Sequence, residues 1–294
     1  MRRHWQLYLV ILLPLIYLVI FKYVPMYGLQ IAFKQYSPAK GFAGSPWVGL
    51  RYFLDFFRSP YFGMTVKNTL YINLVGIVLG FPFPIIFALA LNEADNVAYK
   101  KTVQLITYAP HFISVVVIVQ MILTFLSMRS GLLNNIIVAL GGERVQFMAM
   151  PGLFPYIYVL SNIWQSFGFG AIIYIAALAG INHELYEAAY IDGASRFQKV
   201  LHIDIPGIAP TIIILLILRF GRLMEMGFEK IFLMQNPLNL RGSEVIATYV
   251  YKVGVLHTQY SFGAAVGMFN AVVNLILLLL INRFARSLSE TSLW

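Results

Sequence analysis

Residues 184–206 read ELYEAAYIDGASRFQKVLHIDIP and separate two long apolar stretches of the chain. The segment holds four of the chain's twelve acidic residues, so we expect it to face water. Good helix formers occupy 184–191, Asp192-Gly193 supplies a turn in which glycine can take a positive φ, and 194–202 can form a second short helix. We expect Pro206 to stop that helix and to lead into the next apolar stretch. The sequence therefore predicts a compact hydrophilic elbow, residues 184–206, between two membrane spans.

The composition of the whole chain places it in a lipid bilayer. Hydrophobic residues make up 60% of the 294 residues and charged residues only 11%, against roughly 25% charged residues in a soluble domain. The net charge is +9, and many basic residues flank apolar spans, where lipid headgroups attract them, so nucleic acid is not an expected partner. The chain has no cysteine, which excludes disulfides and Cys-ligated metals. We predict a single transmembrane domain over residues 1–294.

Apolar stretches of the length needed to cross a bilayer, about 20 helical residues, occur six times. Pro25 should kink the first span, which has no cleavage site and is read as retained in the protein. The second half of the fifth span carries Arg219, Arg222, Glu225, Glu229 and Lys230. The predicted fold is an all-α integral membrane protein with six transmembrane helices, at about 7–29, 69–91, 102–128, 155–181, from 208 onward, and 261–282.

The frame of the elbow resembles the EAA motif, the signature loop of permease subunits in ABC importers. Glu187-Ala188-Ala189 is followed by three residues, Gly193, nine residues and Ile203-x-Ile205-Pro206. Ile205 stands where the family more often has Leu, a swap of similar volume that should keep the contact. The resemblance implies a type I ABC importer permease fold in which the elbow is the cytoplasmic coupling loop that contacts an ATPase. The coupling residues it implies are Glu187, Ala188, Ala189, Asp192, Gly193, Ile203, Ile205 and Pro206.

Three further stretches resemble a carbohydrate-importer branch of these permeases, the branch used for oligosaccharides derived from complex polysaccharides. They are residues 25–34, 67–69 and 227–231. The resemblance implies import by alternating access across the bacterial cytoplasmic membrane, with both termini in the cytoplasm. It also implies an assembly of two different permease subunits, two ATPase subunits and an extracellular solute-binding protein.

No residues of the chain form a recognisable catalytic, cofactor or metal site. No Gly-x-x-x-x-Gly-Lys-Ser/Thr stretch is present, so ATP and Mg²⁺ are expected on the partner ATPase subunits. His183-Glu184 followed by Glu187 lacks the second histidine of a zinc-protease helix. We therefore expect a transport subunit and no enzyme.

The charges on the fifth span predict a path for the substrate, because ionisable groups inside a bilayer are costly and normally line a cavity or pair with each other. A water-filled path is the favoured interpretation, and pairing between or within helices is the alternative. Arg219 or Arg222 could meet a carboxylate of an acidic saccharide. The predicted path residues are Arg219, Arg222, Glu225, Met226 and Glu229, with Trp164 and Gln165 of the fourth span.

Two other classes of function remain as alternatives. An ion-coupled secondary transporter would use Glu225 and Glu229 and would need no ATPase. A lipid-modifying membrane enzyme is disfavoured, because no catalytic set is clustered near an interface. Close helix approach is predicted at Gly76 and Gly80, and at Gly263 and Gly267, the latter two as candidates for contact with a partner permease.

Overall fold

The computed structural model describes residues 5–288 and the side chains of 8–283. Apart from one isolated bridge between Lys34 and Trp47, the regular elements of this part of the chain are helices. They form two compact units. The first unit is residues 1–63 with 246–272, and the second is 64–245 with 273–294. The prediction of a single domain over 1–294 stays a prediction.

The membrane spans agree in number with the six expected from the sequence. Five described helices are long and apolar enough to cross a membrane, and a bent pair makes the sixth. The five are Tyr8–Phe33, Pro60–Asn92, Phe154–Leu178, Arg196–Gly221 and Tyr260–Arg283.

The third span differs from the single helix predicted over 102–128. It consists of Val97–Phe112 and Val115–Phe125, which meet at 98°. Pro110 lies in a short 3-10 turn, and Ser114 adopts an extended backbone whose side chain caps the next helix by accepting a hydrogen bond from the Val117 N–H. A prolyl ring followed by a serine N-cap ends one helix and begins another. Hydropathy could not show this break, because both residues sit in an apolar run.

An aromatic cluster and a hydrogen bond from a serine hydroxyl hold the first unit together. Its elements are α1 (Trp5–Leu18), the π-helix η2 (Val19–Tyr23), the 3-10 helix η3 (Val24–Phe33), α2 (Gly41–Gly44), α3 (Arg51–Arg58), α15 (Ile246–Val250), the π-helix η7 (Tyr251–Leu256) and the first part of α16 (Tyr260–Leu288). The buried Phe56 ring packs against those of Tyr249 and Phe269. The Ser261 hydroxyl donates to the carbonyl of Lys34.

Gly263 allows two elements of this chain to pack closely against each other. A Cβ at this position would lie 2.7 Å from the Cα of Gly254, so α16 and η7 touch backbone to backbone here. The expectation that Gly263 faces a partner permease is therefore wrong. Gly267 has open space around it and keeps that possibility.

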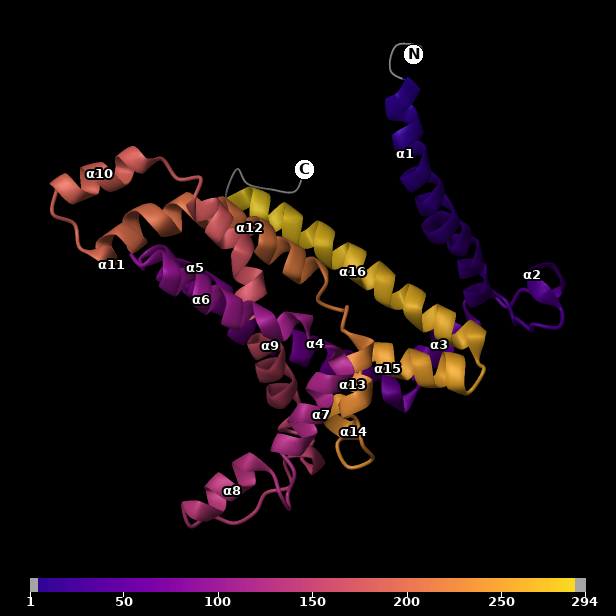
Figure 1. Cartoon of the computed structure of the whole chain (residues 1–294). Helices are drawn as coiled ribbons and strands as arrows, with labels where there is room; N and C mark the ends of the chain where they lie inside the picture. The colour runs from indigo at the N-terminus through magenta and orange to yellow at the C-terminus, as the bar shows by residue number, and fades with distance from the viewer. Residues whose placement is uncertain (1–4, 289–294) are drawn as a thin grey trace. The chain divides into compact units, whose positions relative to one another are not determined.

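The second unit is built around α9. Its elements are α4 (Pro60–Gly80), α5 (Pro82–Asn92), α6 (Val97–Tyr108), the 3-10 helix η4 (Ala109–Phe112), α7 (Val115–Phe125), α8 (Leu132–Ala139), the 3-10 helix η5 (Phe147–Ala149), α9 (Phe154–Leu178), α10 (His183–Ile191), α11 (Arg196–Lys199), the π-helix η6 (Val200–Asp204), α12 (Ile205–Gly221), α13 (Phe228–Met234), α14 (Leu240–Ser243) and the later part of α16. Helices α5 and α6 pack along α9 (Figure 1). As predicted, Gly76 and Gly80 form a close seam, here with Val159 and Ile163 of α9.

Pro206 does not stop the helix, contrary to the sequence prediction. The chain is helical from Arg196 to Gly221, with Pro206 in the first turn of α12. The π-helix η6 precedes it, and the N–H of Ile205 bonds the carbonyl of Val200 five residues back. Because a π-turn is wider than an α-turn, it can accommodate a proline that donates no hydrogen bond.

The fifth span ends at Gly221, so the prediction that its second half also carries Arg222, Glu225, Glu229 and Lys230 is wrong. Arg222, Glu225 and Glu229 lie beyond α12. Side chains from other helices bond the backbone that follows: Asn73 Nδ2 donates to the carbonyl of Leu223 at 2.7 Å, and Asn274 Oδ1 accepts from the N–H of Met224 at 2.9 Å. These long-range contacts satisfy backbone groups that would otherwise require a helix within the membrane.

The α6–α9 contact yields a first prediction. A Cβ at Gly168 would lie 2.5 Å from the backbone carbonyl oxygen of Thr107, so the helices must separate in Gly168→Ala. Overpacking of this kind costs about 1–3 kcal/mol. We expect a lower melting temperature in detergent for Gly168→Ala. The matched control is Gly170→Ala, whose Cβ would make an ordinary contact 3.4 Å from Pro84. Equal melting of the two variants would contradict the packing described.

Candidate functional site

The elbow forms the first predicted helix and the predicted turn, whereas the second predicted short helix is the beginning of the continuous helix Arg196–Gly221. Helix α10 begins after Asn182, whose side chain accepts from the N–H of Glu184, and ends at Ile191. Gly193 takes a φ of 69°, and the N–H of Ala194 bonds the carbonyl of Ala189 at 2.9 Å. A glycine in this conformation just past a helix is a common C-terminal cap.

The second arm of the elbow has its own cap. The Ser195 side chain accepts from the N–H of Gln198, and the Gln198 side chain accepts from the N–H of Ser195, forming a capping box for α11. Both arms therefore begin at side-chain caps encoded within a few residues of sequence, which explains why the local pattern predicted them.

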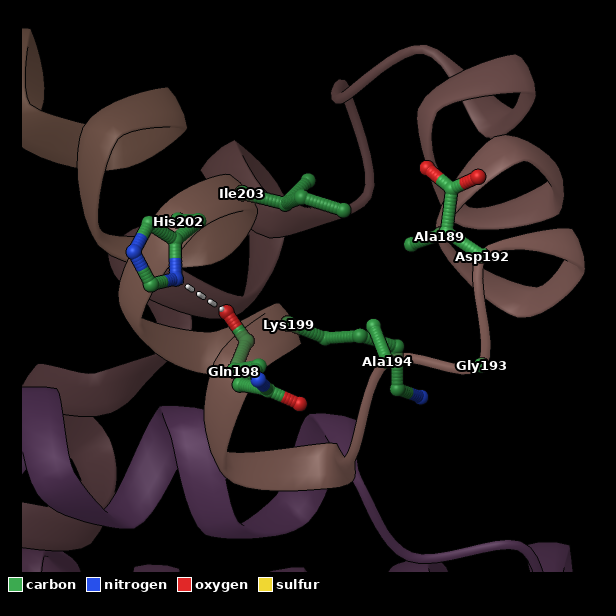
Figure 2. A pocket seen from close by; sticks show the side chains of 8 residues that line it. All are labelled: Ala189, Asp192, Gly193, Ala194, Gln198, Lys199, His202 and Ile203. Carbon is green, nitrogen blue, oxygen red and sulfur yellow. Dashed lines mark hydrogen bonds between the residues drawn. The ribbon is translucent and has the colours of Figure 1, made fainter.

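A hollow of about 350 Å³ lies between the two arms of the elbow (Figure 2). Four of the predicted coupling residues line it, namely Ala189, Asp192, Gly193 and Ile203. The remaining lining residues are Ala194, Gln198, Lys199 and His202, and Nδ1 of His202 lies 3.0 Å from the carbonyl oxygen of Gln198. Glu187 lies on the exposed side of α10, 3.8 Å from His183, and Ala188, Ile205 and Pro206 lie outside the lining.

The elbow also exposes large apolar side chains that sequence reasoning did not single out. Tyr190, Ile191 and Phe197 are 85%, 83% and 75% exposed. Single exposed apolar side chains are common, whereas several that form one patch mark a surface that binds another protein or a membrane. The sequence does contain a signal that could have identified them, namely large apolar residues within an otherwise hydrophilic stretch.

A second feature of the same unit is a cavity of about 750 Å³. Residues from α4, α5, α9, α12 and the segment 222–227 line it. Its polar lining residues are Asn73, Tyr158, Asn162, Ser166, Tyr174, Arg219, Arg222 and Glu225. A cavity of this size, with polar groups converging on a largely apolar wall, is the common form of a small-ligand site.

The cavity brings together four of the seven predicted path residues. Arg219, Arg222, Glu225 and Met226 line it. Glu229, Trp164 and Gln165 lie outside the lining, and the role of all seven in a substrate path stays a prediction. Asn73 and Tyr158 were missed, because a single amide or phenol inside an apolar span gives no periodic signal.

The charged lining carries an excess of positive charge. Arg222 Nε lies 4.0 Å from Glu225 Oε2, a distance at which an exposed pair contributes little. Arg219, in the last turn of α12, has no carboxylate partner among the side chains of residues 8–283. Arg219 is therefore the cavity's guanidinium that is open to an anionic ligand.

Lys230 holds Gln165, a predicted path residue that lies outside the cavity lining. Its buried Nζ donates to Asn162 Oδ1 at 2.7 Å and to Gln165 Oε1 at 3.2 Å. The ammonium thus supports one cavity residue, Asn162, without lining the cavity itself. Burial of a charged lysine requires such partners.

Over the described residues, no cluster of three or more His, Cys, Asp or Glu side chains could hold a metal ion. The two candidate functional features of the described residues are the elbow, with its exposed apolar side chains, and the polar cavity.

Comparison with known proteins gives concordant matches over most of the chain. Residues 80–290 match the family described as "binding-protein-dependent transport system inner membrane component". The chain is 43% identical to the polygalacturonan/rhamnogalacturonan transport system permease protein YteP of Bacillus subtilis (strain 168), over 98% of this chain and 90% of that protein.

Two crystal structures share the fold. One is of a bacterial ABC transporter involved in the import of the acidic polysaccharide alginate, with a TM-score of 0.90 and 42% identity over 98% of this chain and 97% of that one. The other is of a bacterial alginate ABC transporter in complex with an alginate pentasaccharide-bound periplasmic protein, with a TM-score of 0.90 and 41% identity over 99% and 98% of the two chains.

The turn of the elbow yields a second prediction. A Cβ at Gly193 would meet open space, so a substitution there is strained by the positive φ alone. We expect Gly193→Val to disfavour the turn by about 1–2 kcal/mol and Gly193→Asn by less, because asparagine tolerates this conformation. Hydrogen exchange at the Ala194 amide measures the effect. Equal exchange in the two variants would contradict it.

Proposed function

The chain belongs to the family of binding-protein-dependent transport system inner membrane components, and on this premise we propose that it is the permease subunit of an ABC importer for oligosaccharides. It is a multi-pass membrane protein. ATP hydrolysis on separate subunits would drive alternating access, and this chain would supply the path and the docking surface.

The proposed substrate is an acidic, polysaccharide-derived oligosaccharide. The observation that carries this proposal is the 750 Å³ cavity with Arg219 in its wall, a residue that pairs with no carboxylate among the side chains of residues 8–283. A guanidinium can bind a carboxylate through two parallel hydrogen bonds. Support comes from YteP, whose name describes polygalacturonan and rhamnogalacturonan transport, and from the transporter for the acidic polysaccharide alginate.

The proposed assembly contains a second, different permease subunit, two ATPase subunits that hold ATP and Mg²⁺, and an extracellular solute-binding protein. One related transporter has been solved with a periplasmic protein carrying an alginate pentasaccharide, which supports the last of these partners. The elbow would meet an ATPase through the exposed Tyr190, Ile191 and Phe197. With the elbow in the cytoplasm and six spans, we propose that both termini lie on the cytoplasmic side of the bacterial membrane.

No observation favours the ion-coupled alternative. It requires Glu225 and Glu229 to act together, and only Glu225 lines the cavity. Glu225 also has Arg222 beside it, with 4.0 Å between the guanidinium Nε and the carboxylate Oε2.

Import of an acidic sugar provides a third prediction. We expect Arg219→Gln to lower kcat/KM for uptake of an oligouronide about tenfold, because a hydrogen bond to a charged group contributes about 1.5–3 kcal/mol. Arg219→Lys keeps the charge and should recover part of the loss. Arg222→Gln should have a smaller effect, since Glu225 already faces that guanidinium. Uptake by the complete complex in proteoliposomes, with saturating binding protein, is the measurement; a larger loss in Arg222→Gln than in Arg219→Gln contradicts the assignment.

Docking of the ATPase provides a fourth prediction. Burying a large apolar side chain contributes about 1.5–3 kcal/mol, so Ile191→Ser should weaken ATPase binding at least tenfold. Leu140→Ser is the matched control, because Leu140 is also 83% exposed but lies at the end of α8, outside the elbow. Co-purification of the ATPase with each variant compares them. Equal recovery of the ATPase with both variants would count against docking at the elbow.

A further inference from the structure

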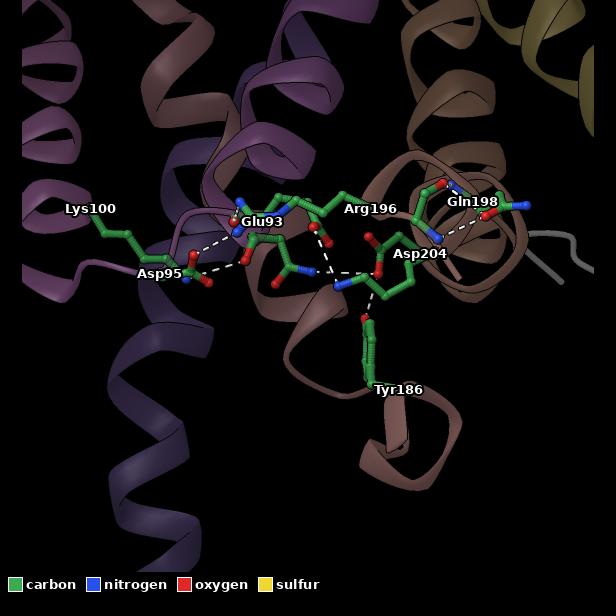
Figure 3. A network of polar contacts seen from close by, with 10 residues as sticks. Glu93, Asp95, Lys100, Tyr186, Arg196, Gln198 and Asp204 are labelled. Carbon is green, nitrogen blue, oxygen red and sulfur yellow. Dashed lines mark hydrogen bonds and ion pairs between the residues drawn. The ribbon is translucent and has the colours of Figure 1, made fainter. Parts of the chain in front are cut away.

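The elbow is attached to the turn at which α5 ends. Arg196 Nη1 donates to the carbonyl of Glu93 at 3.1 Å, and Nη2 donates to Asp95 Oδ2 at 2.8 Å (Figure 3). These residues are about a hundred positions apart in the sequence, and the turn that holds Glu93 and Asp95 joins α5 to α6. The contact therefore links the elbow to the end of a different membrane span.

A second ion pair joins the same two segments. Lys199 Nζ lies 3.5 Å from Glu93 Oε2, and the two side chains are only 26% and 17% exposed. Partial burial reduces screening by water and salt, so this pair holds more firmly than one open to solvent. Glu93 thus takes part in both links, through its carbonyl to Arg196 and through its carboxylate to Lys199.

A fully buried carboxylate completes the attachment. Asp204 is 0% exposed, and its Oδ1 accepts hydrogen bonds from the Tyr186 hydroxyl (Figure 3) and from Asn92 Nδ2. These three residues come from η6, α10 and the last position of α5. Removing a hydrogen-bond partner of a buried carboxylate destabilises the folded protein, because no water can replace the lost hydrogen bond.

The phenol of Tyr186 is suited to this role. Burial, and then its bond to Asp204, raise the pKa of Tyr186 to about 12. The hydroxyl therefore stays protonated at any physiological pH and remains a donor to the carboxylate.

The opposite end of α5 reaches the cavity. Pro84 is in its first turn and lines the cavity, together with Phe81 just before the helix. Helix α5 spans 11 residues, roughly 16 Å at 1.5 Å per residue, and packs along α9. A single rigid helix thus connects the turn gripped by the elbow with the wall of the cavity.

We propose that Asn92, Glu93, Tyr186, Lys199 and Asp204 form a clamp, the α5 clamp, that makes the elbow and α5 move as one body. These are positioning residues: they carry a displacement of the elbow into the cavity wall. The proposal rests on the proposed function, in which an ATPase moves the elbow, and it adds the route by which that movement reaches the substrate.

The first test measures sugar imported per ATP hydrolysed, in proteoliposomes that hold the complete transporter and its binding protein. In Asp204→Ala this ratio should fall about tenfold while the ATPase still co-purifies, because the elbow still binds its partner but no longer moves α5. Asp204→Asn keeps the acceptor for Tyr186 and should restore most of the ratio. Tyr186→Phe should lower the ratio, and Tyr99→Phe, at an exposed tyrosine of α6, should not. An unchanged ratio in both Asp204→Ala and Tyr186→Phe overturns the clamp.

The second test does not depend on whether a destabilised variant folds. The chain has no native cysteine, so Asp95→Cys with Arg196→Cys places a unique pair across the clamp for a short bifunctional thiol reagent. Two segments that move as one body can be crosslinked without loss, so transport should continue in the crosslinked complex. The single-cysteine variants treated with the reagent are the controls.

The two proposals fail in different ways. Transport blocked by the crosslink, in a complex that retains its ATPase, shows that elbow and α5 move relative to each other and overturns the clamp alone. ATPase binding that is unaffected by Ile191→Ser counts against the docking surface, whatever the crosslink does.

Discussion

The carboxyl group of Asp204 lies out of water at the start of α12, and the hydrogen bonds that its Oδ1 accepts determine how the elbow is held. Its described partners come from α10 and from the end of α5, so the bond cannot form unless the elbow folds back onto a span more than a hundred residues earlier. The same elbow leaves Tyr190, Ile191 and Phe197 in the open. A segment that buries a charge and exposes apolar groups is fixed on one side and free to bind on the other.

The cavity depends on a second constraint, the need to satisfy backbone groups where a spanning helix stops early. Helix α12 ends at Gly221, and the amides of Asn73 and Asn274 bond the backbone that follows. Irregular backbone within a membrane is tolerated where it lines a cavity. The segment 222–227 does so here, and it brings Arg222, Glu225 and Met226 to the same cavity wall as Arg219. An anionic sugar would therefore bind at the same cavity wall that the proposed movement of α5 displaces.

Local features could be predicted from the sequence, and long-range ones could not. Composition and span length gave the six-span helical fold, and the Asp192-Gly193 turn was correct because its caps lie within a few residues. The bend at Ser114, the passage of the helix through Pro206 and the end of α12 at Gly221 were predicted wrongly. The bend follows from Pro110 and the Ser114 cap, the passage through Pro206 from a π-turn, and the end of α12 from contacts with Asn73 and Asn274. Hydropathy encodes none of these. The α5 clamp could not be predicted from the sequence, because Asn92 and Asp204 become neighbours only when the chain folds.

A photo-crosslinking amino acid at position 191, in the complete transporter in native membranes, would show whether the elbow contacts the ATPase. We expect a covalent adduct between this residue and the ATPase subunit, stronger than that from the same probe at position 140. An elbow that yields no ATPase adduct at any stage of the transport cycle would contradict it.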